Sequence, residues 1–574
     1  MNAQLSIRRD GVVYTPKKLA EYVAKKTLQY VLDDDYFVAR NQISIIDPAC
    51  GDGELLENIS NLLTKNHKNK TIFCGIDINQ NAISSCKEKF SLDGRDSFRF
   101  VRTNALCPFN QKIFDAGWKK LYEKMKLGEK FDILIANPPW GQTFLPYKER
   151  IDAQEFVTLK KQSDSFEIFL ELAPKIVKPN GYFAFIIPDS ILNQSKRIMR
   201  EKLVSSTEIK YIGRLGEKIF SGINRACVVI ICKNCKPKKN SKIDCFRLLS
   251  NERKIILNYD NSFENAETGN IHKVLQSRFS ENTNKQFDID LKDNEQYVLE
   301  KLFRNTKTVG DYLFSKRGVE LGISGEICLC SKCKSWMPMP KKQLVVCNHC
   351  NNKILLQESK KMSVVTKNKI KNSTLLITGK DLKRYVCVPG QRIILGKKGI
   401  NYKTKNTYQP PKILVRKTGV GITAAIDYTH SYTTQVVYIL KTKKHVETEL
   451  EFFISLLNSR VYYFILAKLY GELEWRSHPY LTQSQIEDLP LPDLEDKTNS
   501  QIIDEIIALM KSSKTADRLT DDIDLEIELL IGRLFKLTKS DYKIIFDSID
   551  QADELLPVKH LKNIELADIL KKNR

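Results

Sequence analysis

The sequence predicts an α/β protein whose first 240 residues form a mostly parallel sheet with helices on both faces, followed by a mixed α/β second half. Two observations support this prediction. Short, nearly continuous apolar runs recur up to about residue 235, and helix-length segments separate most of them. Strands that alternate with helices in this way are typical of parallel sheets buried on both faces.

The predicted elements follow one another in a regular order. A helix at residues 17–32 has apolar side chains at helical spacing, among them Leu19, Tyr22 and Val23. Strands are predicted at residues 43–47, 71–77, 97–104, 131–137, 181–188, 209–213 and 226–232. A basic segment that contains proline, KNCKPKKNS, follows at residues 233–241, and we place the first domain boundary after residue 240.

The carboxyl ends of the predicted strands are where a ligand is expected, because open α/β sheets bind ligands there. The first end reads Asp47-Pro-Ala-Cys-Gly51-Asp52-Gly53, and its glycines allow a tight turn and close approach of a ligand. The acidic side chains would repel a pyrophosphate, whereas they suit a ligand with a cationic amine and sugar hydroxyls. A plain strand-to-helix turn is the alternative interpretation.

Two further strand ends carry polar residues that suit a nucleoside. Asp77 ends the second strand, about one βα unit further on, where an acid can accept from both hydroxyls of a ribose. Thr103 and Asn104 follow the third strand, where a polar side chain could bind an adenine edge. An ordinary solvated aspartate is the alternative for Asp77.

The fourth strand ends in Asn137-Pro-Pro-Trp140. Prolines suit a strand end because they cannot donate to a sheet ladder. Tyr14-Thr15-Pro16 and Asp47–Gly53 precede this loop, and Phe220 follows it in a strand-loop-strand unit. This order of motifs resembles the N6-adenine DNA methyltransferases of the gamma arrangement, which are class I S-adenosylmethionine-dependent methyltransferases. The resemblance covers essentially all of the first 235 residues.

The resemblance implies a Rossmann-like sheet and S-adenosylmethionine as the cofactor. It assigns cofactor binding to Tyr14, Thr15, Pro16, Asp47, Pro48, Ala49, Cys50, Gly51, Gly53, Asp77, Ile78, Asn104, Ala105 and Asn137. The family usually has aspartate at the position of Asn104, whose amide oxygen can still accept from the adenine amino group. A helix start, with Thr15 as the N-cap and Pro16 just inside, is a second interpretation of these two residues, and both can hold together.

The resemblance assigns catalysis to Asn137, Pro138, Pro139 and Trp140. The N6 nitrogen of adenine must become pyramidal to attack a methyl group, and two acceptors placed for that geometry favour the transition state over the planar ground state. The side-chain oxygen of Asn137 and the carbonyl of Pro138 would supply them. Trp140 and Phe220 are predicted to stack on a base flipped out of the duplex. A core aromatic packed beside Ile219 is the alternative for Phe220.

A cysteine cluster lies in the second half of the chain. Its two CxxC pairs are formed by Cys330, Cys333, Cys347 and Cys350. Two such pairs predict a closed tetrahedral zinc site that stabilises a ribbon at residues 327–352, without a catalytic role for the metal. Cys328 and His349 are further candidate ligands, which we interpret as bystanders.

Residues 300–495 resemble the C-terminal specificity domains of the same methyltransferases, in segments such as ITGKDLKRYV and HPYLTQSQIEDLPLP. Such domains read bases in the major groove, so residues 241–495 are predicted to recognise the DNA target. The expected phosphate or base contacts are Lys383, Arg384, Lys397, Lys398, Arg416 and Lys417. A solvated basic surface is the alternative for each of them. Residues 496–574 contain amphipathic segments and predict a helical tail without chemistry.

The charge of the chain also favours a nucleic-acid partner. Lysine and arginine outnumber aspartate and glutamate by 92 to 69, a formal net charge of +23. This excess suits a polyanion, because each neutralised phosphate releases counterions. No apolar run approaches the ~20 residues needed to span a bilayer, and the start lacks the apolar core of a secretory signal. A cytoplasmic protein without a membrane partner is therefore expected.

Together these features predict a sequence-specific DNA methyltransferase that acts on adenine N6 in a restriction-modification or related defence system. Its expected partners are double-stranded DNA and a separately encoded restriction endonuclease. An Asn-Pro-Pro-aromatic loop also occurs in methyltransferases for cytosine N4, for guanine N2 in ribosomal RNA and for protein glutamine, but the Thr-Pro element and the basic second half favour DNA adenine.

Two other hypotheses belong to different functional classes. One is a DNA-binding module with a degenerate methyltransferase fold, which the intact strand-end motifs oppose. The other is a methylase fused to a nuclease. Few residues precede Tyr14, so we expect methylation alone.

Overall fold

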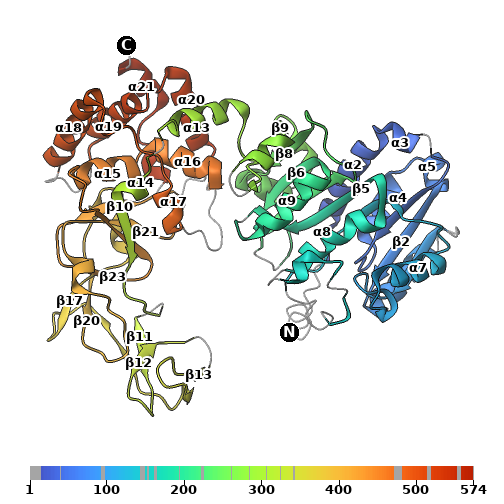
Figure 1. The fold of residues 1–574 in the computed structure, drawn as a ribbon, viewed down its shortest axis with the longest axis horizontal. Helices are drawn as coiled ribbons and strands as arrows, with labels where there is room; N and C mark the ends of the chain where they lie inside the picture. Colours follow the sequence, from blue (N-terminus) through green and yellow to red (C-terminus); the bar gives the residue numbers. More distant parts are fainter. Residues whose placement is uncertain are drawn as a thin grey trace. The chain divides into compact units, whose positions relative to one another are not determined.

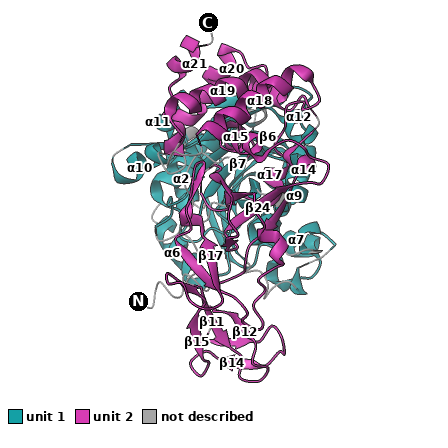
Figure 2. Cartoon of the chain, turned by 90° about the vertical axis from the view of Figure 1, so that its left-hand side faces the viewer, with its two compact units in different colours: residues 1–292 teal, residues 293–574 magenta. Residues whose placement is uncertain are grey.

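The chain forms two compact units, residues 1–292 (unit 1) and residues 293–574 (unit 2), shown in Figure 2. The computed structural model describes residues 14–38, 40–91, 97–141, 149–151, 154–160, 164–192, 194–221, 225–259, 261–282, 285–305, 307–322, 325–340, 343–419, 421–470, 481–513, 519–552 and 558–572.

Unit 1 is built on a nine-stranded sheet with the order β3-β2-β1-β4-β5-β7-β6-β8-β9 (Figure 1). Its strands are β1 (Ile43–Asp47), β2 (Thr71–Asp77), β3 (Phe98–Arg102), β4 (Phe131–Ala136), β5 (Val177–Pro188), β6 (Glu208–Gly216), β7 (Cys227–Lys233), β8 (Lys242–Arg247) and β9 (His272–Leu275). The first five strands pair in parallel, and β7 lies antiparallel between β5 and β6. All the predicted strands are confirmed.

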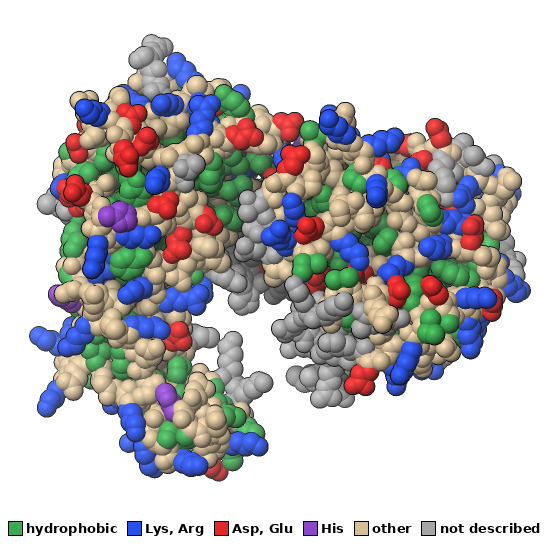
Figure 3. All heavy atoms as spheres, in the orientation of Figure 1, with side chains coloured by type: hydrophobic (Ala, Val, Ile, Leu, Met, Phe, Trp, Pro, Cys, Tyr) green, Lys and Arg blue, Asp and Glu red, His purple; other side chains and the backbone are tan. Residues whose placement is uncertain are grey.

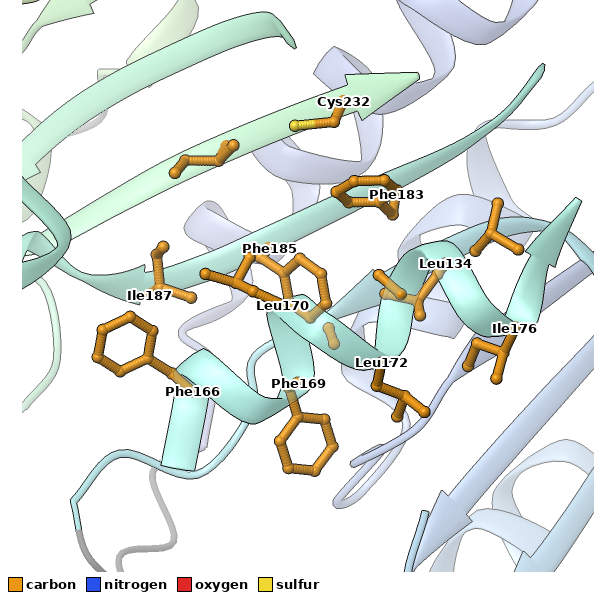
Figure 4. Packing of buried hydrophobic residues seen from close by; sticks show 14 of the residues in the cluster. Leu134, Phe166, Phe169, Leu170, Leu172, Ile176, Phe183, Phe185, Ile187 and Cys232 are labelled. Carbon is orange, nitrogen blue, oxygen red and sulfur yellow. The ribbon is translucent and has the colours of Figure 1, made fainter. Parts of the chain in front are cut away.

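Helices cover both faces of this sheet. They are α2 (Lys17–Leu32), α3 (Asp35–Val38), α4 (Glu54–Leu62), α5 (Lys65–Asn69), α6 (Gln80–Ser91), α7 (Phe114–Lys124), α8 (Ser165–Ile176), α9 (Arg197–Ser206), α10 (Ser250–Asn258), α11 (Phe263–Glu267) and α12 (Gln276–Glu281). Helices α2, α4 and α6 bury the face that carries Ile45 and Ile133, and α7, α8 and α9 bury the face of Ile46 and Leu134. Figure 4 shows side chains of α8 packed on those of β5 on the second face.

The first compact unit extends beyond the domain boundary expected after residue 240. Strand β8 pairs in parallel with β6, and β9 pairs antiparallel with β8, so residues 241–292 continue the sheet. Neither strand contains a long apolar run. Strand β8 reads KIDCFR, and β9 lies at the edge of the sheet and exposes alternate side chains. This short, half-exposed strand has no clear signal in the sequence.

Unit 2 begins with α13 (Asp293–Leu302) and α14 (Val309–Tyr312) and contains two four-stranded sheets. One has the order β10-β24-β21-β22, with β10 (Leu313–Arg317), β21 (Lys412–Arg416), β22 (Ala424–Asp427) and β24 (Val437–Thr442). The other has the order β16-β20-β17-β23, with β16 (Val365–Thr366), β17 (Ser373–Ile377), β20 (Gln391–Ile394) and β23 (Tyr432–Thr433). A short hairpin joins β18 (Leu382–Lys383) and β19 (Val386–Cys387).

The cysteine-containing part of unit 2 is a ribbon of short strands. Three of them form one sheet, β11 (Glu326–Leu329), β12 (Trp336–Pro338) and β15 (Lys361–Ser363), and two form a hairpin, β13 (Leu344–Val346) and β14 (Lys353–Leu355). In the view of Figure 3, lysine and arginine side chains are prominent around this end of unit 2.

The rest of unit 2 is helical. It consists of α15 (Leu450–Leu457), α16 (Arg460–Tyr470), α17 (Gln483–Glu487), α18 (Lys497–Ser512), α19 (Asp521–Leu534), α20 (Lys539–Asp550) and α21 (Leu566–Lys572). The expected tail at residues 496–574 packs into this unit, since α18 contacts α15 and α20 contacts α16. Among the residues that the structure describes, no single helix is long and apolar enough to cross a membrane; the bent pair α15 and α16 passes by length and composition alone.

Candidate functional site

The predicted cofactor residues of the first two strands lie together at one edge of the sheet. Strands β1 and β2 pair in register, with Asp47 opposite Gly75. The amide of Gly51 donates to Asp77 Oδ2 at 3.0 Å, which ties the loop after β1 to the end of β2. The amide of Ala49 donates to Asp47 Oδ1 at 3.0 Å and holds the first turn of that loop.

The glycine loop packs closely against helix α6. Gly53 has a φ of +81°, and a Cβ there would lie 2.8 Å from the Phe90 ring and 3.1 Å from Cys86 Sγ. Both the backbone conformation and the lack of space therefore require glycine. Cys86 also donates from Sγ to Gly51 O at 3.3 Å. Sequence reasoning missed Cys86, because its only signal is the helical spacing that places it on the buried face of α6.

The two acids of the site are unusually hard to ionise. Complete burial raises the pKa of Asp47 to about 8, and the neighbouring carboxyls of Asp77 and Asp52 add to the effect, although the Ala49 amide opposes it. Burial also raises the pKa of Asp77, against the lowering effect of hydrogen bonds from the amides of Asn79 and Gly51. A cation placed beside these carboxyls would favour their ionised forms.

Asn104 follows β3 at the same edge and is half-buried. Its Oδ1 accepts from the Leu106 amide at 2.9 Å, so one lone pair of that oxygen already serves the local turn. A carbonyl oxygen can accept a second hydrogen bond, which leaves the predicted contact with an adenine amino group open. Of the other predicted cofactor residues nearby, Ile78 is exposed and Ala105 is buried.

The N-terminal motif lies over both the glycine loop and the fourth strand end. The ring of Tyr14 is 3.9 Å from the position that a Cβ on Gly51 would occupy. Asn137 Nδ2 donates to Thr15 Oγ1 at 3.1 Å. The structure does not use Thr15 as the N-cap of α2, because the helix begins at Lys17 after Pro16 and has no side-chain cap. The side chain of Thr15 thus contacts the Asn137 loop.

The two aromatic rings predicted to hold a base contact each other. The rings of Trp140 and Phe220 lie edge to face, with their centroids 5.1 Å apart and their planes at 83°. Both rings are buried in the core cluster that also contains Ile219. This burial agrees with the alternative interpretation of Phe220 as a core aromatic. A base stacked between parallel rings needs about 7 Å between them, twice the usual carbon-carbon separation of ~3.5 Å. This pair would therefore have to reorient to hold a base on both faces.

The four predicted zinc ligands come together in the ribbon. The sulfur atoms of Cys330, Cys333, Cys347 and Cys350 all lie within 4.8 Å of one another. The Cys330–Cys350 and Cys333–Cys347 Sγ distances are both 3.7 Å. Zinc-sulfur bonds of ~2.3 Å in a regular tetrahedron place sulfur atoms about 3.8 Å apart, so the arrangement fits tetrahedral zinc. His349 points elsewhere, with Nε2 3.1 Å from Gly399 O.

The structure contradicts a DNA contact for Arg384. Its two Nη atoms donate to the two carboxylate oxygens of Asp524 at 2.7 Å each, and Nε and Nη2 also donate to Asn458 O. Only 8% of this side chain is exposed. Arg384 therefore forms a buried structural ion pair, and nothing in the sequence near residue 384 indicates a partner 140 positions away.

The other predicted DNA contacts differ in exposure. Lys383 and Lys398 are exposed, whereas Lys397 is half-buried with its ammonium group 5.9 Å from the Trp336 ring. Arg416 and Lys417 are also half-buried, and burial lowers the pKa of each. The nearby guanidinium of Arg317 lowers the pKa of Lys417 further, which indicates a concentration of positive charge at this point of unit 2.

Comparison with known families agrees with the arrangement of unit 1. The model of the N-6 DNA methylase family matches residues 1–304, which is more than half of the chain. The chain belongs to the N-6 DNA methylase family. Residues 374–491 of the chain match the model of the TaqI-like C-terminal specificity domain.

Curated relatives of the chain include two type II methyltransferases. M.BanIII of Aneurinibacillus aneurinilyticus is 27% identical over 226 residues, which cover 38% of this chain and 37% of the relative. M.VspI of Vibrio sp. (strain 343) is 23% identical over 235 residues, which cover 41% of this chain and 51% of the relative. The chain thus matches about half, or less, of the length of these relatives.

A solved structure has a similar fold across both units. It is a nuclease-deletion mutant of the Type ISP restriction-modification enzyme LlaGI in complex with a DNA substrate mimic. The likeness covers 88% of this chain and 47% of that chain, with a TM-score of 0.51 and 12% sequence identity. At this identity the likeness concerns the fold.

Proposed function

We propose that this protein transfers a methyl group from S-adenosylmethionine to the N6 nitrogen of an adenine in duplex DNA. The observation that carries the proposal is the position of the Asn137 loop. Asn137 contacts Thr15 at 3.1 Å, and it follows β4, which pairs in parallel beside β1 and therefore ends at the same sheet edge as Asp47. A methyl acceptor bound at this loop would lie beside a cofactor bound at Asp47.

The residues at this edge suit S-adenosylmethionine. Asp47 offers a carboxylate to positive charge, and Asp77 can accept from ribose hydroxyls. Gly51 and Gly53, both at positive φ, form a turn that has no Cβ to oppose the close approach of a ligand. When bound, the cofactor supplies an electrophilic methyl group. The remaining predicted cofactor residues, Tyr14, Thr15, Pro16, Pro48, Ala49, Cys50, Ile78, Asn104 and Ala105, are proposed to complete the site.

The loop provides the acceptors that the amino group needs. Asn137 Oδ1 and the carbonyl of Pro138 are proposed to accept its two hydrogens in tetrahedral geometry, which stabilises the transition state more than the planar ground state. Pro138 and Pro139 restrict the backbone, so the acceptors are fixed in advance. The target base would be flipped out of the duplex and would displace the edge-to-face contact of Trp140 and Phe220.

Unit 2 is proposed to seat the duplex and read its sequence. The match to the TaqI-like specificity domain supports this role. Lys383, Lys397, Lys398, Arg416 and Lys417 remain proposed contacts, and the cysteine ribbon is proposed to bind one structural zinc ion. Type II methyltransferases among the relatives support a place in a restriction-modification or related defence system. A separately encoded nuclease is proposed as a further partner.

The proposal is tested by expressing the protein in a host that lacks N6-adenine methylation. We expect N6-methyladenine in digested host DNA by mass spectrometry, and single-molecule sequencing would locate the modified site. N4-methylcytosine in place of N6-methyladenine would establish the cytosine alternative, and modified RNA or glutamine with unmodified DNA would establish the others. Well-expressed protein that modifies none of these would support the non-catalytic binding module.

The matched variant is Asn137→Ala, which removes one proposed acceptor. It is expected to lower kcat by ~100-fold or more, as for the loss of a group that binds the transition state. Unchanged methylation by this variant would refute the catalytic assignment.

A further inference from the structure

The backbone of the Asn137 loop cannot hold itself in place by sheet hydrogen bonds. Pro138 and Pro139 have no amide hydrogen to donate. Gly141 follows them with a φ of +107° and has no side chain to anchor the chain, and a Cβ built on it would meet no atom of the described residues within 4 Å. Groups from other elements must therefore define where residues 138–141 lie.

One such group is the hydroxyl of Ser165, the first residue of α8. Ser165 Oγ lies 2.5 Å from Pro139 O and 2.7 Å from Gly141 O, and its single proton can be donated to either carbonyl. The Ser165 amide also donates to Gly141 O, at 3.1 Å. The side chain is buried, so water does not compete for these bonds.

The second group is the carboxylate of Asp164. Its Oδ1 accepts from the Gly141 amide at 2.7 Å, and its Oδ2 accepts from Arg225 at 2.9 Å. The Asp164 amide donates to Glu167 Oε1 at 2.9 Å, so the residue that holds Gly141 is itself held by the first turn of α8. The anchor therefore rests on a regular helix.

Arg225 connects this anchor to the aromatic part of the site. Its guanidinium group lies 5.9 Å from the centroid of the Trp140 ring while it pairs with Asp164. It comes just before β7, on the connection that also carries Phe220. One side chain thus contacts both the loop that would hold the target amino group and the carboxylate that fixes its end.

We propose that Asp164, Ser165 and Arg225 are positioning residues that fix the Pro138 carbonyl and the Trp140 ring for the reaction. The proposal rests on the proposed function for its effect on methylation. Its structural part, that these side chains hold residues 138–141, can be measured without activity. Asp164 and Ser165 lie outside the predicted motifs, and α8 begins 24 residues after Gly141 in the chain. Arg225 lies in the strand-loop-strand unit of Phe220, but it was not predicted as a site residue.

The test compares Ser165→Ala and Asp164→Ala with Ser205→Ala, a matched control on α9. Ser205 is exposed, and its hydroxyl donates to Lys202 O, three residues earlier on the same helix, at 3.2 Å. Hydrogen exchange of the peptide around residues 136–141 is measured by mass spectrometry on the free full-length protein. Exchange is expected to be at least ~10-fold faster in the two loop variants. Their kcat should be ~10-fold to 100-fold lower, with the KM for S-adenosylmethionine within about twofold of wild type.

A conservative pair tests the same role if Asp164→Ala disturbs folding. Asp164→Asn keeps an acceptor for the Gly141 amide but loses the negative charge that pairs with Arg225. Arg225→Lys keeps the positive charge but loses the planar guanidinium group. Both are expected to show smaller losses of kcat than Asp164→Ala and Arg225→Gln, with melting temperatures near that of wild type.

Three results would overturn the proposal. The first is hydrogen exchange and kcat of Ser165→Ala that both stay within twofold of the Ser205→Ala control. The second is faster exchange in the loop variants with unchanged kcat. The third is reduced kcat in the loop variants with unchanged exchange. Wild-type protein that methylates no DNA would instead refute the proposed function, and the exchange measurement would still decide whether these residues hold the loop.

Discussion

The carboxyl group of Asp47 is buried beside Asp77 and Asp52, and burial raises its pKa to about 8. At neutral pH the free protein therefore holds this group largely protonated. A bound cation favours the carboxylate, so binding of a cationic cofactor must release the proton. The affinity of the site for a cationic cofactor is therefore expected to rise with pH.

We predict that affinity for S-adenosylmethionine rises with pH by up to tenfold per unit between about pH 6 and pH 8, and levels off above. The reason is that the free energy needed to deprotonate Asp47 falls as the pH approaches its pKa. Calorimetric titration in buffers of different ionisation enthalpy measures both the affinity and the released proton. A constant affinity without proton release would contradict this role of Asp47.

Asp47→Asn is predicted to stabilise the free protein while it weakens cofactor binding at least ~10-fold. The pKa of Asp47 is higher in the folded than in the unfolded state, so its neutral form favours folding at low pH, and this advantage is lost as pH rises through about 8. Asparagine has no such penalty. The gain in melting temperature over wild type should be a few degrees at pH 8 and smaller at pH 5; an equal or lower melting temperature at pH 8 would be inconsistent with the burial.

At the scale of elements, the ribbon has a small core made largely of its own cysteines. The buried members of its cluster are Cys328, Cys330, Met337, Cys347 and Ile354. Short strands with so little apolar area need another source of stability, and a metal site can supply it. The sulfur distances of 3.7 Å match that role.

Purified protein is predicted to contain one zinc ion per chain by elemental analysis. Cys330→Ser should abolish the bound zinc and make the ribbon sensitive to proteolysis, because a structural zinc site needs all four ligands. Cys387→Ser, a thiol of unit 2 outside the group of four, is the control and should retain the metal. Full zinc content in the Cys330 variant would show that the ligand set is wrong.

A group of buried ion pairs lies in the helical part of unit 2. Arg384 and Arg460 both pair with Asp524. Burial alone would raise the pKa of Asp524, but the two guanidinium groups hold that pKa down to about 2. Arg460 also pairs with Glu528 at 3.1 Å, so two arginines face two carboxylates. Removing one partner leaves an uncompensated buried charge.

Arg384→Ala is predicted to destabilise unit 2 by ~3–5 kcal/mol, because Asp524 loses its bidentate partner. The neighbouring variant Lys383→Ala removes an exposed charge and should change stability by less than ~0.5 kcal/mol. Chemical denaturation of both variants, followed by far-ultraviolet circular dichroism, measures the difference. Similar midpoints for the two would mean that the ion pair contributes little.

At the scale of the whole molecule, the net charge of +23 favours DNA through many weak phosphate contacts. Binding to duplex DNA is predicted to weaken steeply with salt. Lys398→Ala and Arg416→Ala should each lower the slope of log affinity against log salt by about 1. Fluorescence anisotropy measures the slope, with the exposed Lys543→Ala on α20 as control; slopes equal to that of the control would exclude these two residues as phosphate contacts.

The sequence was sufficient for features that depend on neighbouring residues. The strands of unit 1 alternate with helices as predicted, because apolar runs and turn residues act locally. The motif ends at Asp47, Asp77 and Asn137 meet at one sheet edge, since parallel strands align their carboxyl ends. The two CxxC pairs converge for a similar reason, because each pair lies on one short turn.

The sequence by itself thus determined the α/β architecture, the order of the strand-end motifs and the four grouped cysteines. Only the tertiary structure decided the features that depend on distant partners. These are the extension of the sheet through β9, the burial of Arg384 against Asp524, the contact of Trp140 with Phe220, and the Ser165 and Asp164 bonds to Gly141. Burial and hydrogen bonding are set by whatever the fold places nearby, and the spacing of residues along the chain does not encode those neighbours.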